Sequence, residues 1–310
     1  MHPAWPRYES TESAAADSLA FASCQPGAST LKIVNLFLAE PLMKYTPRRL
    51  KTNVNITPTS PLKELVVLVG GLLAIGVGVY VLMGFAVDLI APRISIDLEK
   101  KLAAPFLHTL KKSTSTHKQQ PYVQSLIDDL QSRCTDLPYD FKVHIIESEM
   151  ANAAAMPGGH ILIYSGLLEQ VSSENELVFI LGHELGHYAH RDHLRGLGRG
   201  LVLLTMSVVL FGSDNAVGNL LSRGLNITEM GFSRKQEAQA DASGLETLHC
   251  AFGHVAGATD FFSKMSEDQD PGRWGHYFAS HPENRRRITH LENLARDHGY
   301  PKGPLTPLTK

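Results

Sequence analysis

The pattern of apolar and polar residues divides the chain into a membrane-like segment and a following folded region. Residues 65–87, LVVLVGGLLAIGVGVYVLMGFAV, contain no charged side chain. A helix rises about 1.5 Å per residue, so a run of this length can cross a hydrocarbon layer of roughly 30 Å. The run starts too far from Met1 for a cleaved signal peptide and is longer than the apolar region of one. We therefore predict one transmembrane helix at 65–87.

The segment before this helix has a different composition. Residues 1–60 are rich in Ser, Thr, Ala and Pro, which predicts a largely disordered N-terminal segment. An apolar island at 31–43 is either a short interfacial helix or a local cluster.

The region after the span alternates in character. Apolar residues at helical spacing predict helices at 94–112 and 120–134. Residues 140–148 and 151–168 are richer in β-branched residues around a Pro-Gly-Gly turn, which predicts a strand, a turn and a second strand. The pattern is helical from there onward, so we expect a mainly α fold with a small β-sheet, an α+β unit.

A second apolar run follows the glycine-rich residues 196–200, which we expect to be flexible. It occupies 201–212 and is too short to cross a membrane. We expect a core helix or a helix that dips into the membrane.

Length, charge and cysteine content narrow the function classes. A chain of 310 residues is long enough for one folded unit with appendages. The net charge of -2 and the absence of a basic stripe exclude nucleic acid as an implied partner. Cys24, Cys134 and Cys250 are widely spaced without a CxxC pair, so we expect neither a disulfide framework nor a thiolate zinc site.

The predicted helix at 175–191 carries an H-E-x-x-H pattern. His183 and His187 are four residues apart, which places two imidazoles on one helix face where both can reach a single ion. Glu184 then lies beside the open coordination position, as in zinc proteases. The alternative is that these are ordinary core or surface residues, but that leaves a carboxylate and two imidazoles without partners among leucines.

The third metal ligand has two candidate sources. His193 lies ten residues after His183, as in H-E-x-x-H-x-x-G-x-x-H, but His190 occupies the position where that pattern needs glycine. Glu237 is the leading alternative. It stands four residues before Asp241 among small alanines, and Asp241 could orient a histidine.

Four motifs in order carry a family resemblance. They are NAAAMPGG at 152–159, HELGH at 183–187, EAQAD at 237–241 and SHP at 280–282. Together they resemble the membrane-associated zinc metallopeptidases that include HtpX, the CAAX prenyl protease and BepA, a gluzincin family. The resemblance spans about 94–296 and implies a zincin-like metallopeptidase domain at 94–300, behind the transmembrane helix.

The resemblance also implies roles for individual residues. His183, His187 and Glu237 would bind one Zn²⁺, with Asp241 supporting a ligand. The catalytic residues would be Glu184 as acid and base and His281 as a stabiliser of the oxyanion. Arg287 would pair with an active-site carboxylate.

A substrate-binding segment is implied as well. In the family, an asparagine and a Pro-Gly-Gly turn precede an edge strand that borders the substrate cleft. The matching residues here are Asn152, Gly158, Gly159 and His160. An extended peptide could add to such a strand through main-chain hydrogen bonds.

The predicted span and the H-E-x-x-H pattern indicate a membrane-anchored zinc metalloendopeptidase, and the family resemblance implies a role in protein quality control. Its partners would be protein or peptide substrates, misfolded or membrane-associated, and the lipid bilayer around 65–87, with homo-oligomerisation left open. We expect a single-pass protein of the bacterial inner membrane. A slight excess of basic residues before the span favours an orientation with the protease domain outside the cytoplasm.

Two other classes stay open. One is an inactive zinc-containing chaperone or scaffold, in which His190 or His193 closes the site as a fourth ligand. The other is a secreted metzincin, which requires a Met-turn and removal of residues 1 to about 91; the sequence shows neither a convincing Met-turn nor a cleavage signal.

Overall fold

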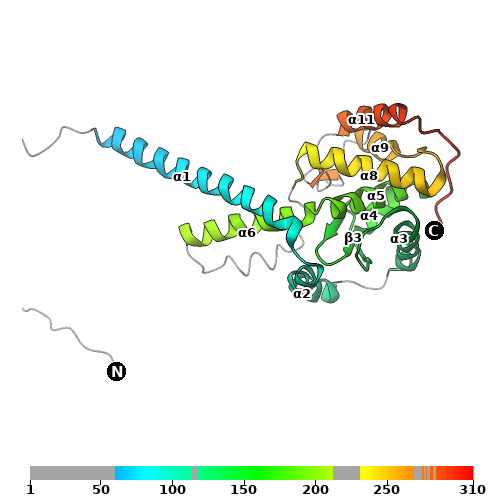
Figure 1. The fold of residues 1–310 in the computed structure, drawn as a ribbon, viewed down its shortest axis with the longest axis horizontal. Helices are drawn as coiled ribbons and strands as arrows, with labels where there is room; N and C mark the ends of the chain where they lie inside the picture. The colour runs from blue at the N-terminus through cyan, green and yellow to red at the C-terminus, as the bar shows by residue number, and fades with distance from the viewer. Residues whose placement is uncertain are drawn as a thin grey trace, which may run out of the picture. The chain divides into compact units, whose positions relative to one another are not determined.

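The computed structural model describes a membrane-type helix and the folded region that follows it (Figure 1). The described residues are 60–113, 117–211, 231–267, 274, 275, 277, 280, 281 and 284–309. The segment predicted to be disordered, with its apolar island, lies outside them apart from Ser60.

Helix α1, Pro61–Ile90, contains the predicted transmembrane segment. A proline occupies its first turn, where the missing N–H costs no hydrogen bond. None of its residues is buried, and it continues into the 3₁₀ turn η1, Ala91–Arg93. This continuous helical segment is long and apolar enough to cross a membrane.

Helices α2, Ile96–Ser113, and α3, Gln120–Cys134, form close to the predicted ranges. The sheet that follows has three strands: β1, Lys142–Ile146; β2, Ala153–Met156; and β3, His160–Tyr164. Its order is β1-β3-β2, with β1 parallel and β2 antiparallel to β3.

This topology corrects the expected position of the edge strand. The strand that follows the Pro-Gly-Gly turn is β3, which lies in the middle of the sheet because β1 pairs along its other side. Among the residues that the structure describes, the edge strand beside it is β2, whose alanines carry little β-branched signal. Gly158 and Gly159 make the β2–β3 turn with φ of +84° and +89°, a region that favours glycine.

The predicted mainly α fold with a small sheet is confirmed, and the site helix lies at its centre. Helix α5, Glu174–Ala189, packs against β2 on one side and α8, Arg234–Phe252, on another (Figure 1). Short α4, Ser165–Gln170, links β3 to α5, while α9, Asp260–Glu267, and α11, Asn284–Asp297, pack together, with α11 also contacting α8.

Local sequence sets where α5 and α8 begin. The Ser173 side chain accepts a hydrogen bond from the Glu176 backbone N–H at the start of α5. Ser233 and Gln236 form a reciprocal capping box at the start of α8. Both helices therefore begin at a defined residue, and this fixes the register of the side chains between them.

Helix α6, Asp192–Phe211, includes residues 196–200, where the sequence predicts a flexible segment. The structure has a continuous helix there instead, and Gly198 packs against α1. A side chain at Gly198 would come within 2.7 Å of Val87, so glycine lets α6 approach α1 closely. The pair is also joined by Arg199, whose Nη2 donates to both carboxylate oxygens of Asp88 at 3.0 Å.

A disulfide joins Cys134, the last residue of α3, to Cys250 on α8, with Cα atoms 5.7 Å apart. The wide spacing of the cysteines predicts no disulfide framework, and for this pair the prediction is wrong. The two cysteines are separated by 116 residues, and only the packing of α3 on α8 brings them together.

Candidate metal centre

Two packed helices bring the predicted metal-binding side chains together. His183 and His187 lie one turn apart on α5, and Glu237 lies in the first turn of α8. The Nε2 atoms of the two histidines are 3.1 Å apart. Glu237 carboxylate oxygens lie 3.7 Å from His183 Nε2 and 3.6 Å from His187 Nε2, and all three residues are buried.

Carboxylates orient both imidazoles from behind. Asp241 Oδ1 lies 3.0 Å from His183 Nδ1, and Asp192 Oδ2 lies 3.1 Å from His187 Nδ1. If each Nδ1–H donates to its carboxylate, both Nε2 lone pairs face the shared point, as metal-binding histidines require. Asp192 was missed in the sequence, although an acid five residues after the second histidine of H-E-x-x-H is visible there.

Charge around the cluster favours an ionised Glu237. Burial alone would raise the pKa of Glu237, but His281 and Arg287 hold that pKa well below its usual range. Arg287 Nη1 lies 2.7 Å from Glu237 Oε2, and its Nη2 donates to Asp241 Oδ1 at 2.6 Å. This arginine therefore pairs with the carboxylates of both Glu237 and Asp241.

The two histidines differ in their electrostatic surroundings. Burial lowers the pKa of His183, so its ring is neutral at pH 7. Burial would also lower the pKa of His187, but hydrogen bonds to Asp192 and Glu237 outweigh it and raise the pKa to about 9. A cation at the shared point would take the place of that extra proton, because a metal ligand must present a lone pair.

Glu184 and His281 complete the cluster. Glu184 Oε2 and His281 Nε2 are buried and have no hydrogen-bond partner among the residues that the structure describes. His281 Nε2 lies 3.8 Å from Glu184 Oε1, and its Nδ1 lies 3.0 Å from Glu237 Oε1 and 3.3 Å from His183 Nε2. One ligand atom from each of His183, His187, Glu237 and His281 lies within 4.8 Å of the others.

This donor set fits zinc. Imidazole nitrogens and a carboxylate are ordinary Zn²⁺ ligands, and one atom from each of the four residues lies within 4.8 Å of the others. A buried cluster of this kind is costly without a compensating cation.

Comparison with known proteins agrees with this chemistry. Residues 117–295, more than half of the chain, match peptidase family M48. The chain belongs to peptidase family M48. The family resemblance that the four motifs indicated is thereby confirmed. M48 peptidases are zinc-dependent, so the cofactor predicted for the cluster is Zn²⁺.

The chain matches only part of the length of each curated relative, from 40% to 62% in the three cases below. The chain is 29% identical over 218 residues to the mitochondrial metalloendopeptidase OMA1 of Danio rerio, covering 64% of this chain and 46% of the relative. It is 29% identical over 161 residues to metalloprotease LoiP of Escherichia coli, covering 50% of this chain and 62% of the relative. A putative beta-barrel assembly-enhancing protease of Vibrio cholerae is 26% identical over 200 residues, 60% of this chain and 40% of that protein.

The four predicted substrate-binding residues lie at the two opposite ends of β2. Asn152 is buried, with Oδ1 3.5 Å from the hydroxyl of Ser280, the neighbour of His281. Gly158, Gly159 and His160 follow the other end of β2 and do not join the cluster.

The alternative metal ligands also lie elsewhere. His193 Nε2 is 2.7 Å from Glu99 Oε1, inside a separate buried network. His190 caps the C-terminus of α5. Among the residues that the structure describes, the metal-type cluster includes neither of them.

Proposed function

We propose that this chain is a membrane-anchored zinc metalloendopeptidase that hydrolyses peptide bonds of protein substrates. The observation that carries the proposal is the buried cluster of His183, His187 and Glu237, with His281 close to it and buried Glu184 Oε1 3.8 Å from His281 Nε2. Zinc held there would supply a Lewis acid that polarises the peptide carbonyl and lowers the pKa of water to about 7.

The chain's own residues would carry the proton. Glu184 Oε2 accepts a proton from the attacking water, and the same carboxyl passes it to the leaving nitrogen. General acid and base transfer of this kind contributes about 10² to 10⁴ in rate. His281 Nε2 lacks a partner within the described residues, and we propose that it donates a hydrogen bond to the developing oxyanion.

Glu184→Gln tests the mechanism directly. We expect this variant of the detergent-solubilised full chain to keep one zinc per chain and to lose cleavage of an unfolded protein by about 10² or more. Glu246→Gln is the matched control, because Glu246 is exposed on α8 and faces away from the cluster. Cleavage by Glu184→Gln at the wild-type rate would refute the proposal.

The position of His281 also supports a second candidate, a closed structural zinc site in a non-catalytic chaperone or scaffold. Its Nδ1 is close enough to the other three ligands to serve as a fourth, and a site with four protein ligands holds no reactive water. Zinc affinity of His281→Ala separates the two. A large loss of affinity together with an inactive wild type favours the structural site, whereas retained zinc with reduced cleavage favours the peptidase.

For the substrate, we favour an extended polypeptide bound along the free edge of β2. This strand begins beside Asn152, near the cluster, and main-chain pairing gives affinity with little side-chain specificity. Low specificity agrees with quality-control cleavage of misfolded or membrane-associated proteins. The role of the β2–β3 turn would then be structural: Gly158 and Gly159 form the turn, and His160 begins β3, at the end of β2 away from Asn152.

For location, we favour a bacterial inner-membrane protein with the peptidase domain outside the cytoplasm. The Cys134–Cys250 disulfide supports this orientation, because disulfides persist in oxidising compartments. A reporter active only outside the cytoplasm, fused after Lys310, tests the orientation. If a reporter that is active only in the cytoplasm were active at the same position, the proposed orientation would be wrong.

A further inference from the structure

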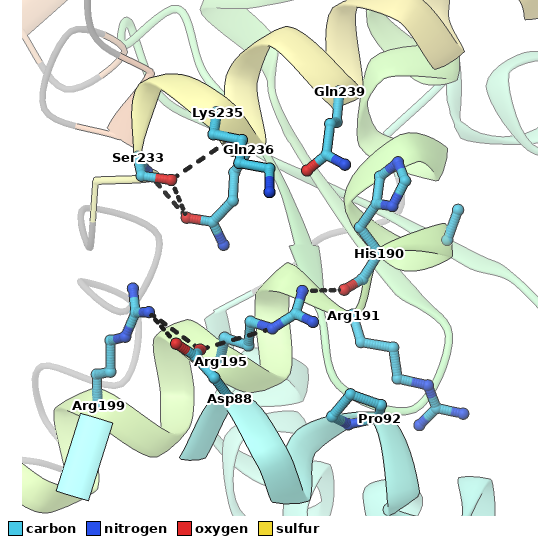
Figure 2. Close-up of a pocket in the computed structure, with 11 residues that line it drawn as sticks. Asp88, Pro92, His190, Arg191, Arg195, Arg199, Ser233, Lys235, Gln236 and Gln239 are labelled. Carbon is cyan, nitrogen blue, oxygen red and sulfur yellow. Dashed lines mark hydrogen bonds and ion pairs between the residues drawn. The ribbon is translucent and has the colours of Figure 1, made fainter. Parts of the chain in front are cut away.

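A hollow lies where α1 ends and α6 begins. It has a volume of about 610 Å³ and is lined by Asp88, Pro92, Ala189, His190, Arg191, Arg195, Arg199, Ser233, Lys235, Gln236 and Gln239. Figure 2 shows Arg195 and Arg199 converging on Asp88, with Ser233, Lys235 and Gln236 on the α8 side. None of the four residues of the metal-type cluster lines it.

The lining is basic. It contains three arginines and one lysine against a single carboxylate, Asp88. Arg195 divides its contacts between Asp88 and Asp192, and Arg191 contacts Glu99 at 3.4 Å. Each of these two guanidinium groups therefore already has a carboxylate neighbour.

Two basic side chains of the lining, Arg199 and Lys235, have N–H donors available for a ligand. Arg199 bonds Asp88 through Nη2 alone, so within the part of the chain that the structure describes its Nε and Nη1 donors have no partner. Lys235 is exposed, and no acceptor for its ammonium lies within the described ranges. Guanidinium and ammonium donors around one hollow are the groups that bind phosphate.

The hollow lies where the uncharged segments of α1 and α6 meet their first charged residues. On α1 this boundary is Asp88, which follows the uncharged run at 65–87. On α6 it is Arg199, after which Gly200–Phe211 carries no charge over about 18 Å of helix. The Asp88–Arg199 pair joins the two boundaries, and α1 and α6 contact each other and diverge beyond the pair (Figure 1).

We propose that this hollow binds the phosphate of an anionic phospholipid headgroup. The acyl chains would lie along the exposed apolar side chains of α1 and α6, which include Val209 and Leu203. A lipid ligand fits better than a free phosphate, because the same hollow opens beside surface suited to hydrocarbon. Arg195 and Gln236 also bond Asp192, which orients His187, so a bound headgroup would lie close to the support of the metal centre.

Lys235→Gln is the test variant. A single Lys or Arg beside an anionic membrane surface contributes roughly fivefold to affinity. Lys302→Gln is the matched control, because Lys302 is equally exposed but lies outside the lining. Lys235→Arg should keep the preference, since it keeps a donor with the same charge.

The experiment is native mass spectrometry of the full chain in detergent, titrated with phosphatidylglycerol or phosphatidylcholine of the same acyl chains. We expect wild type, Lys302→Gln and Lys235→Arg to retain phosphatidylglycerol preferentially. Lys235→Gln should lose about fivefold of that preference with its zinc content unchanged.

Two results would overturn the proposal: equal retention of both lipids by wild type, or an unchanged preference in Lys235→Gln. A third arm adds excess inorganic phosphate without lipid. If the protein takes up free phosphate but shows no lipid preference, the hollow is an anion site and the lipid assignment is wrong.

Discussion

Replacing Cys134 and Cys250 by serine should destabilise the peptidase domain mainly through the unfolded chain. The disulfide closes a loop of 116 residues, for which chain entropy gives roughly 4.8 kcal/mol at 25 °C. Measured effects are typically smaller than this, so we expect a loss of about 2–4 kcal/mol in the free energy of unfolding. Cys250 is exposed and Cys134 only partly buried, so the serines themselves add little.

Urea unfolding of the zinc-loaded full chain, followed by the fluorescence of buried Trp274, measures this loss. Reducing the wild type should lower its midpoint as much as the double substitution does, whereas Cys24→Ser should change nothing. Equal midpoints for oxidised wild type and the double variant would show that the crosslink does not stabilise the domain.

Two further predictions concern buried Glu99 and half-buried His160, which lie away from the metal centre. Glu99 accepts hydrogen bonds from Gly158 N–H and Tyr139 O–H at 2.9 Å and contacts His193, which helps hold its pKa low against burial. Glu99→Gln should therefore cost about 1–3 kcal/mol in urea unfolding, and an unchanged midpoint would contradict this. Burial and neighbouring His144 lower the pKa of His160 to about 4, below the value of about 6.5 in the unfolded chain. Between these two pKa values the unfolded state binds more protons than the folded state, so the free energy of unfolding falls as the pH drops from about 6.5 toward about 4. His160→Gln lacks this group. Its free energy of unfolding should therefore fall less than that of wild type between about pH 7 and about pH 5.

Local patterns predicted the parts of the structure that depend on local sequence. The uncharged run at 65–87 and the helical spacing at 120–134 are properties of continuous segments, and α1 and α3 form there. The spacing of His183 and His187 fixes a shared helix face before any tertiary packing is known. The placement of these residues therefore followed from the sequence.

Features that depend on tertiary packing did not follow. The partner of Cys134 is 116 residues away, and nothing near either cysteine indicates the pair. His193 looked like a ligand by its spacing, yet Glu99, 94 residues before it, holds its ring. The strand β2 was missed because its alanines are buried by α5 and β3 rather than marked by β-branched residues.

The glycine inside the H-E-x-x-H pattern has a tertiary role that sequence spacing cannot give. A Cβ at Gly186 would lie 2.8 Å from Ser243 Cβ and 2.9 Å from Ala240 Cα, so the bare backbone lets α8 approach α5. That approach is what brings Glu237 within reach of both histidines. Gly196, on α6, has nothing within 4 Å of the same position and serves as the control.

Gly186→Ala should cost about 1–3 kcal/mol from overpacking, only partly offset by a helix-propensity gain of up to about 1 kcal/mol. Gly196→Ala should be neutral or slightly stabilising, because it has the propensity gain without the clash. Urea unfolding gives the first quantity, and zinc competition with a chelator shows whether Gly186→Ala also weakens the metal site. If the two alanine variants behaved alike in both measurements, the α5–α8 spacing would not depend on Gly186. If only Gly186→Ala lost zinc, the distance between two helices, and not the ligand residues alone, would set the metal affinity.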